Sequence, residues 1–274
     1  MKRIIDVLRQ NQIDCLPSER FTLDVKMFPE GDEEYQYPRQ VLFENPKLNA
    51  GKKSVRDVTF SLFRYFLDGS QRSYQVIDAS LGGRYLPLCA GQIGVAVLER
   101  LDNGRLVPRR DLSSIENILA FPNVLEDANV KDLETKINAE MDSRYFFRSV
   151  RYNLKDEEKD PADLGRAMII HEMQMLELKT IREMIKSNLI RSDRMLAKDG
   201  GLQYRDTKIR DLNFSKDDIV QLRNVIGLAK TFKPSLTVGQ GRGRKDLGNL
   251  TKGLEWKERS TVISYWRRSQ NRPK

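Results

Sequence analysis

Two aspartates in this sequence each follow an apolar run and precede a glycine. Asp68 follows FSLFRYFL at residues 60–67, and Asp199 follows MLAK at residues 195–198. If both runs are central strands of one sheet, the two carboxylates reach the edge where ligands of open α/β folds collect. Converging carboxylates bind Mg²⁺ or Mn²⁺, and such ions activate water for phosphodiester cleavage. A single Asp-Gly after a strand is more often only a turn.

A third carboxylate is expected from the helical segment at residues 164–190. Its apolar stripe consists of Ile170, Met173, Ile181 and Met184. Glu177 falls on the same stripe at helical spacing and should face the sheet. There it is either a metal ligand or an edge residue whose carboxylate snorkels or pairs with a basic neighbour. Glu172 and Glu183 are the other helix candidates, but solvated pairing with Lys179 explains them better.

Basic residues gather toward the end of the chain. Residues 241–274 hold ten Lys or Arg against three acidic residues, which accounts for seven of the nine net positive charges. Positive potential attracts nucleic-acid phosphates, although charge alone fits a solvated tail equally well. Lys230 ends the run VIGLA, where its ammonium could bind the scissile phosphate, but a solvated lysine is commoner there. The residues expected to contact DNA are Lys230, Arg242, Arg244, Lys245 and Arg259.

Other kinds of chemistry find little support. Cys15 and Cys89 lie far apart without zinc-site spacing, so neither a disulfide framework nor a zinc site is indicated. His171 is the only histidine, and the sequence has no Gly-x-Ser-x-Gly motif to supply a nucleophile beside it, so a serine hydrolase is not indicated. GQGRGR at residues 239–244 lacks the phosphate-loop pattern, so a nucleotide-hydrolysing enzyme is not indicated either. The sequence opens without an apolar signal core and holds no stretch long enough to span a bilayer. We expect a cytoplasmic protein with no membrane partner.

The elements that must position these residues follow from hydrophobic spacing. Helices are expected over residues 1–13, 129–142 and 164–190 and after Ser215. Strands are expected at residues 60–67, 74–77, 85–99, 105–108, 195–198 and 225–230, the first two joined as a hairpin by a turn at Gly69-Ser70. This order predicts an α/β fold with a mixed sheet flanked by helices. We expect residues 1–55 to form an N-terminal helix with an irregular extension, and residues 56–274 the main domain.

Together, three motifs resemble the NurA nuclease family. YFLDGS at residues 65–70 resembles its first-strand Asp-Gly-Ser motif, and MLAKDGGLQ at residues 195–203 resembles its later Asp-Gly-x-Leu motif. VIGLAK at residues 225–230 resembles its Val-Ile-Gly-x-x-Lys strand. In order and character the match covers about residues 60–265. Gly201 departs from the family by standing where a serine is common.

The resemblance implies a ribonuclease H-like core with N-terminal and helical insertions. It implies a DNA nuclease with 5′–3′ exonuclease and endonuclease activity that uses two Mn²⁺ or Mg²⁺ ions. It assigns catalysis to Asp68, Glu177, Asp199 and Lys230, and metal binding to the three carboxylates. The implied partners are DNA, a second copy in a homodimer, and the hexameric ATPase HerA in end resection. The family's C-terminal histidine has no counterpart here, so we expect the last strand and helix to be missing.

Two other interpretations stay open. An Argonaute-type slicer domain also uses an Asp, Glu, Asp set, although guide-binding modules are not evident in the first 60 residues. A non-catalytic DNA clamp or scaffold for a motor ATPase would use the same basic surface. Substituting Asp68 separates the scaffold from the nuclease, because only a nuclease would lose cleavage while still binding DNA. Repair and phage defence remain equally open as the biological role.

Overall fold

The computed structural model groups the chain into two compact units. One unit contains residues 1–24 and 62–228, and the other contains residues 25–61 and 229–274. The residues that the structure describes are 2–18, 41–42, 52–55, 61–81, 83–142, 145–154, 160–202, 211–229, 237–238, 245–260 and 263–264. Both units combine segments from distant parts of the sequence. The division expected near residue 55 stays a prediction.

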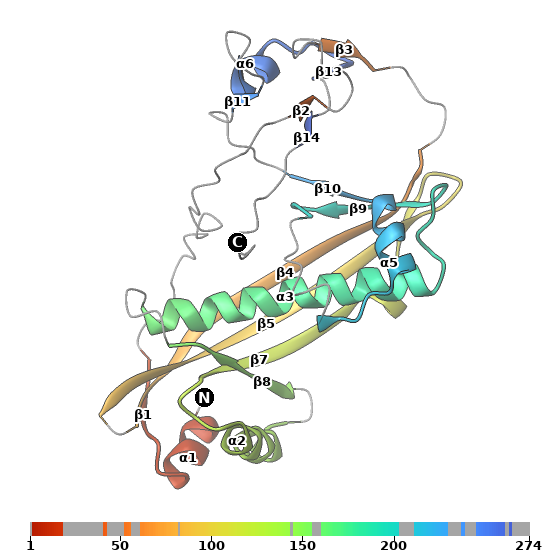
Figure 1. The fold of residues 1–274 in the computed structure, drawn as a ribbon. Helices are drawn as coiled ribbons and strands as arrows, with labels where there is room; N and C mark the ends of the chain where they lie inside the picture. Colours follow the sequence, from red (N-terminus) through yellow and green to blue (C-terminus); the bar gives the residue numbers. More distant parts are fainter. Residues whose placement is uncertain are drawn as a thin grey trace. The chain divides into compact units, whose positions relative to one another are not determined.

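The larger unit is built on one mixed sheet (Figure 1). Its strands are β1 (Asp14–Pro17), β4 (Phe63–Leu81), β5 (Arg84–Arg100), β6 (Leu106–Pro108), β7 (Ser114–Pro122), β8 (Phe147–Tyr152), β9 (Met195–Asp199) and β10 (Val225–Leu228). They follow the order β10-β9-β4-β5-β7-β8, with β1 added to β4 and β6 added to β5. β4, β5 and β7 form an antiparallel meander, whereas β9 is parallel to both β4 and β10. The predicted mixed α/β sheet is confirmed.

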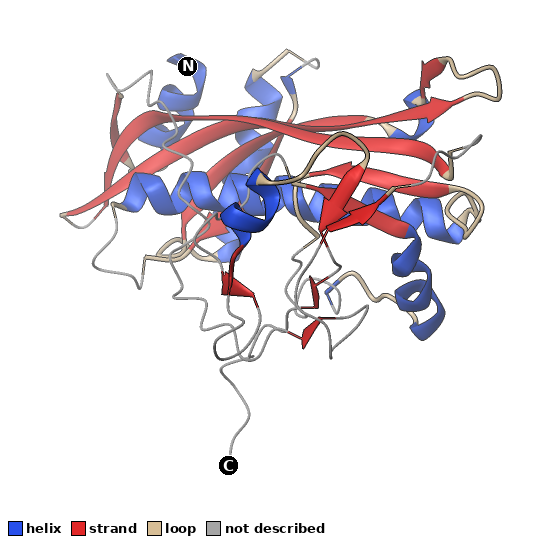
Figure 2. Cartoon of the chain, turned by 90° about the horizontal axis from the view of Figure 1, so that it is seen from above, coloured by secondary structure: helices blue, strands red, loops and turns tan. Residues whose placement is uncertain are grey.

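The helices of this unit are α1 (Lys2–Gln10), α2 (Asp127–Glu140), α3 (Pro161–Lys186) and α5 (Lys216–Gln221), with 3₁₀ turns η1 (Arg110–Leu112) and η3 (Leu222–Asn224). Of these helices, α3 and α5 begin with side-chain caps. Asp160 caps α3 by accepting a hydrogen bond from the Ala162 N–H at 2.9 Å, and Pro161 takes the first position. Figures 1 and 2 both show α3 running along the strands of the sheet. The helices predicted at 129–142, at 164–190 and after Ser215 are all present.

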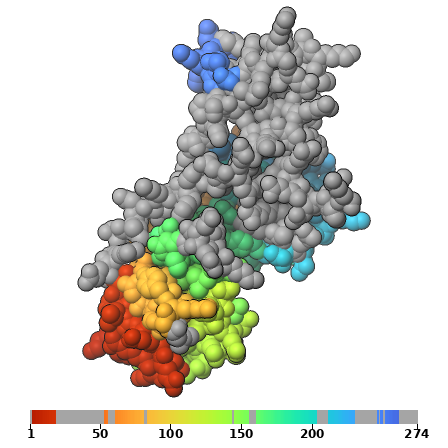
Figure 3. Space-filling view, turned by 60° about the vertical axis from the view of Figure 1, so that its left-hand side comes forward, coloured from red at the N-terminus to blue at the C-terminus, as the bar shows by residue number. Residues whose placement is uncertain are grey.

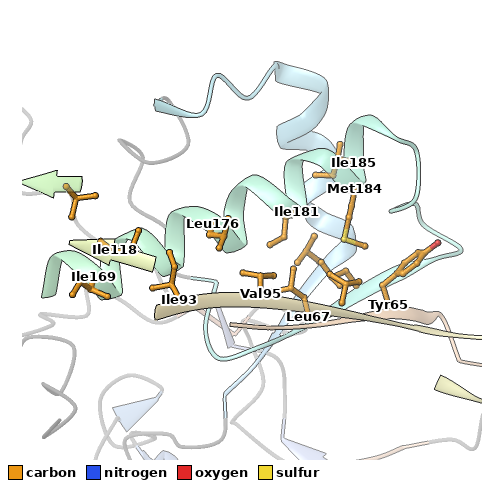
Figure 4. Close-up of a cluster of buried hydrophobic side chains, with 14 of the residues drawn as sticks. Tyr65, Leu67, Ile93, Val95, Ile118, Ile169, Leu176, Ile181, Met184 and Ile185 are labelled. Atoms are coloured by element: carbon orange, nitrogen blue, oxygen red, sulfur yellow. The ribbon is translucent and has the colours of Figure 1, made fainter. Parts of the chain in front are cut away.

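Two hydrophobic cores lie on opposite faces of the sheet. α3 covers the first core, whose strand residues alternate along β4, β5 and β7, as for Leu67, Val95 and Ile118 (Figure 4). α1 and α2 cover the second core, which contains Ile77 and Leu119. The space-filling view shows α1 in red at the surface beside the orange tip of the β4–β5 hairpin, in agreement with the pairing of β1 with the end of β4 (Figure 3).

A β-bulge in β4 puts two consecutive residues, Val76 and Ile77, in the second core. The register between β4 and β5 shifts between Gln75 and Ile77, so that Val76 is the extra residue. Before the bulge the odd-numbered Tyr65 and Leu67 lie in the first core, and after it the odd-numbered Ile77 lies in the second. A single extra residue reverses the faces of all residues that follow it in a strand.

The predicted hairpin turn at Gly69-Ser70 is wrong. β4 is continuous over 19 residues, and Gly69 pairs with Val95 of β5 inside it. The chain reverses near Gly83, which has a φ of +75°. Gly69 is not among the described glycines with positive φ, so its backbone conformation does not explain why a glycine stands there. The remaining property of glycine is its missing side chain.

The predicted stripe of α3 is partly wrong. Ile181 and Met184 are buried as expected. Ile170 and Met173 are only partly buried, and Ile169 belongs to the core instead. A stripe drawn at nearly 3.5-residue spacing drifts around a helix of 3.6 residues per turn, and α3 is 26 residues long.

The smaller unit contains short elements among its described residues. They are β2 (Val41–Leu42), β3 (Lys52–Ser54), β11 (Thr237–Val238), β12 (Lys245–Asp246), α6 (Leu247–Lys252), β13 (Glu258–Ser260) and β14 (Ile263–Ser264). β3 pairs with β13, β2 with β14, and β11 with β12, all antiparallel. Two of these three pairs join the N-terminal part of the sequence to its C-terminal part.

Candidate functional site

Asp68 and Asp199 lie at the same level of two neighbouring parallel strands. In the pairing of β4 with β9, Leu67 is opposite Lys198, and the two aspartates are the next residues on their strands. Neighbouring strands run about 4.8 Å apart, and residues at the same level of a parallel pair point to the same face. Asp68 is exposed and Asp199 is partly buried. The structure therefore brings these two carboxylates together where β9 ends.

Glu177 packs from α3 onto the sheet face that carries Leu67 and Lys198, whereas strand alternation puts Asp68 and Asp199 on the opposite face. The Glu177 side chain is almost completely buried, with 3% of the residue exposed. A Cβ added to Gly69 would lie 2.3 Å from Glu177 Oε1 and 2.9 Å from its Cδ. The carboxylate thus fills the space that any side chain at position 69 would need. This contact places Glu177 against the residue that follows Asp68, and it explains a glycine in the middle of a strand.

Lys198 is a site residue that the sequence analysis missed. Its Nζ lies 3.0 Å from Glu177 Oε2, and the two side chains are 6% and 4% exposed. The same ammonium donates a hydrogen bond to the backbone carbonyl of Asp199 at 2.7 Å. The alternation of side chains in β9 could have indicated that Lys198 is buried, because Lys198 falls on the same face of the strand as the buried Leu196. A lysine at a core position of a strand requires a partner of opposite charge.

β10 supports the turn that follows Asp199. The Gly200 N–H donates to the Leu228 carbonyl at 2.9 Å, and Gly200 has a φ of +80°. A Cβ on Gly227 would lie 2.6 Å from the Gly200 carbonyl oxygen, so a glycine is needed for this close approach. Lys230, the expected phosphate contact after this strand, lies outside the residues that the structure describes.

The structure separates the three helix glutamates. Glu172 forms an ion pair with Arg148 at 2.8 Å, and Arg148 also pairs with Glu116 at 2.9 Å. The interpretation of Glu172 as a solvated partner of Lys179 is therefore wrong, because Glu172 joins α3 to strand β8. Glu183 is exposed, as is Lys179. Of the three, Glu177 is the one against Gly69 and Lys198.

The other sequence candidates belong to the smaller unit, to another part of α3, or to residues outside the described ranges. Arg242 and Arg244 are outside them. Lys245 belongs to β12 and Arg259 to β13, both in the smaller unit, and Arg259 donates to the Ser260 carbonyl at 3.0 Å. His171 is partly buried on α3.

Neither cysteine is placed for chemistry. Both thiols are free and buried. Burial raises the pKa of Cys89 to about 12, which keeps its thiol protonated at neutral pH. The structure thus gives Cys89 the properties of a core residue.

Asp68 and Asp199 would give a metal ion only two protein ligands. Among the described residues, no three or more His, Cys, Asp or Glu side chains form a group that could hold one. Mg²⁺ sites commonly use one or two carboxylates and complete their octahedron with waters and substrate phosphates. The hard oxygens of Asp68 and Asp199 fit an ion of this kind.

Comparisons with known proteins leave this geometry as the basis for assigning a function. No protein-family model and no curated protein matches this chain. Within the described part of the chain, the helices are too short or too polar to cross a membrane.

Proposed function

We propose that this protein is a metal-dependent nuclease that hydrolyses phosphodiester bonds in DNA. The observation that carries the proposal is the register of β9 on β4, which sets Asp68 and Asp199 side by side. Both belong to strands with partners on either side, since β4 lies between β9 and β5, and β9 between β4 and β10. Such strands hold ligands in a fixed geometry more precisely than loops do.

The strand order supports a ribonuclease H-like core. A meander of β4, β5 and β7 is followed by β9 and β10, which extend the sheet from the first strand in parallel. This arrangement resembles the ribonuclease H order, in which α3 would be the helix that brings a carboxylate to the first strand. The additions to this core are α1 with β1 at the N-terminus, and α2 with β8 after the meander.

Asp68 and Asp199 would hold Mn²⁺ or Mg²⁺ through their carboxylate oxygens. A divalent ion supplies Lewis acidity at the phosphate and lowers the pKa of a bound water. The protein's own contribution is to orient the oxygens. Gly69 gives Glu177 room to pack against β4, and Lys198 holds both the Glu177 carboxylate and the Asp199 backbone.

The substrate and partners of this proposal come from charge and from the resemblance to NurA. A net charge of +9, concentrated after residue 240, favours a polyanion such as DNA. The resemblance extends the proposal to a cytoplasmic homodimer that acts on DNA ends with a HerA-type ATPase. Lys230, Arg242, Arg244, Lys245 and Arg259 are the proposed phosphate contacts.

A second candidate function is a DNA-binding scaffold without catalysis. Glu177 is bound to Lys198, and no three-carboxylate group occurs among the described residues. A scaffold would retain DNA binding through its basic residues and would need no metal.

Digestion of end-labelled DNA with Mn²⁺ tests the proposal. Asp68→Asn and Asp199→Asn are each expected to lower cleavage by at least about a hundredfold, because the loss of even an outer-shell metal partner costs about 10–100-fold. DNA binding should persist in both variants. Asp132→Asn is the control, since Asp132 is an exposed residue of α2 that pairs with Lys136. Cleavage that survives both site substitutions, or that is absent from the native protein, would favour the scaffold.

A further inference from the structure

The turn between α6 and β13 holds a tryptophan out in solvent. Trp256 is 89% exposed, which is the highest value of any large hydrophobic residue that the structure describes. Tryptophan is highly buried on average, because its large indole gains much from leaving water. The indole of Trp256 therefore adds almost nothing to a core of the smaller unit, and it is accessible to a partner.

The backbone of this turn fixes the position of Trp256. The Glu258 N–H donates to the Glu255 carbonyl at 3.0 Å, and the Glu255 N–H donates to the Glu258 carboxylate at 2.7 Å. The Val55 N–H, just after β3, donates to the Lys257 carbonyl at 2.7 Å. Lys257 has a φ of +62°, a conformation that turns normally give to glycine or asparagine. The turn is thus held in one conformation that is strained for a lysine, as is common where a backbone presents a binding residue.

The exposed charged side chains near the indole are mostly basic. Lys252 ends α6, Lys257 follows the tryptophan directly, and Lys53 belongs to β3, which pairs with β13. All three lysines are exposed. Within the turn itself Glu255 is exposed, whereas Glu258 is partly buried and its carboxylate accepts the hydrogen bond that closes the turn. Positive charge around an aromatic ring is the combination that attracts phosphates and offers bases a stacking surface.

Resting on the proposed function, we propose that Trp256 binds single-stranded DNA by stacking its indole on one unpaired base. The three lysines attract the phosphates that flank this base. A nucleic-acid strand supplies a phosphate and a base at every nucleotide, whereas a protein partner would need acidic groups for the lysines as well as a cover for the indole. Bases within a duplex already stack on one another, so the substrate of the nuclease is a DNA end with an unpaired strand.

Tryptophan fluorescence tests this proposal without any measurement of cleavage. The sequence has two tryptophans, so Trp266→Phe leaves Trp256 as the only emitter. Titration of this variant with oligothymidylate in EDTA should quench the emission, because the indole stacks on a base.

Substitution of Trp256 gives the second measurement. Trp256→Ala should weaken oligothymidylate binding by about 5–150-fold, the range for the loss of one stacked base, and Trp256→Phe should weaken it less. A blunt-ended duplex should bind the native protein and Trp256→Ala equally well. Phe146→Ala is the matched control, because Phe146 is an aromatic residue of the larger unit that is 64% exposed, and its binding of oligothymidylate should be unchanged.

The outcomes separate this proposal from the proposed function. Unquenched emission, or equal affinity of the native protein and Trp256→Ala for oligothymidylate, would overturn the stacking and point to a protein partner for the indole. An equal loss of affinity for oligothymidylate and duplex would overturn it too, since stacking distinguishes the two. A protein that binds single strands through Trp256 but cleaves no DNA with Mn²⁺ would refute the nuclease and keep this inference. One that binds no DNA would refute both.

Discussion

At position 69 the backbone is that of an ordinary strand, but the space beside its Cα atom is taken by the Glu177 carboxylate. Gly69→Ala should therefore lower the free energy of unfolding by about 1–3 kcal/mol, the usual cost of overpacking. The carboxylate cannot simply move aside, because Lys198 holds its other oxygen. Urea denaturation measures the loss, and Mn²⁺-dependent cleavage should fall in the same variant.

Gly94→Ala is the matched control for that substitution. Gly94 lies in β5, and a Cβ there would be 3.4 Å from the Ser114 carbonyl oxygen, which is ordinary contact. Its stability should be unchanged or slightly higher, because alanine reduces the entropy of the unfolded chain. Equal stability of the two variants would show that the Glu177 contact does not restrict position 69.

The Glu177–Lys198 pair should behave as a coupled unit. Glu177→Leu and Lys198→Met each leave one buried charge without this partner, which typically costs about 3–5 kcal/mol. The double variant should be more stable than the sum of the two losses predicts, by about 1–3 kcal/mol. Urea denaturation of the four proteins gives the coupling energy, and additive losses would contradict the pairing.

At the level of single residues, sequence reasoning located the carboxylates but not their support. Asp199 follows from the end of its strand and Glu177 from helical spacing, which are local patterns, whereas Asp68 lies inside β4 and not at the strand end that was predicted for it. The role of Gly69 depends on a side chain more than 100 positions away in the sequence, and turn chemistry gave the wrong reason for it. Lys198 followed the alternation of its strand, but a charged residue is normally assigned to the solvent face.

Among the elements, α5 leads the chain into β10 and begins with a reciprocal capping box. The Ser215 backbone N–H donates to Asp218 at 2.9 Å, and the Asp218 N–H donates to Ser215 Oγ at 3.1 Å. The hydrogen bond from the Ser215 backbone lowers the pKa of Asp218 below its ordinary value of 3.8. The ionised carboxylate is therefore the form that stabilises the fold.

Asp218→Asn should cost about 0.3–1 kcal/mol of stability at neutral pH, the range for a charge at a helix N-terminus. Because the folded-state pKa is depressed, the contribution is complete above pH 3.8 and is lost as the pH falls through the folded-state value. Denaturation of both proteins between pH 7 and pH 3 measures this. A difference that does not shrink toward pH 3 would contradict the role of the carboxylate.

Element types were more predictable than element boundaries and pairings. α2, α3, β5, β9 and β10 follow from apolar spacing within one segment. β7 and β8 were missed because SIENILAFP and FRSVRY are short and carry charged residues that are paired only in the fold, as Glu116 is with Arg148. The continuity of β4 through Asp-Gly-Ser could not be inferred either, since it depends on pairing with the whole length of β5.

For the molecule as a whole, metal binding should increase the free energy of unfolding. Mn²⁺ at about a hundred times its Kd would stabilise the native state by about 2.7 kcal/mol, because the unfolded chain lacks the site. Differential scanning fluorimetry should show a Tm increase of several degrees that EDTA reverses. Asp68→Asn and Asp199→Asn should abolish the increase, whereas Asp132→Asn should keep it. An equal increase in all four proteins would indicate binding elsewhere.

The class of fold was predictable at this scale, but the grouping of distant segments was not. Alternating strands and helices specify a mixed α/β sheet without any knowledge of contacts. The pairing of β3 with β13 joins residues about 200 positions apart, and no local pattern encodes such a partner. The basic segment after residue 240 remains a prediction from charge, since most of its basic side chains fall outside the described residues.

The bulge at Val76 has a consequence for the core of α1 and α2. Val76 and Ile77 follow one another in the sequence, and both lie in this core, so the extra residue adds a second apolar side chain to the same face of the sheet. β5 faces both cores through Leu88 and Cys89, so the bulge widens the contact with the second core without being needed to reach it. Deletion of Val76 should weaken that core and leave unchanged the register that aligns Asp68 with Asp199, which lies before the bulge.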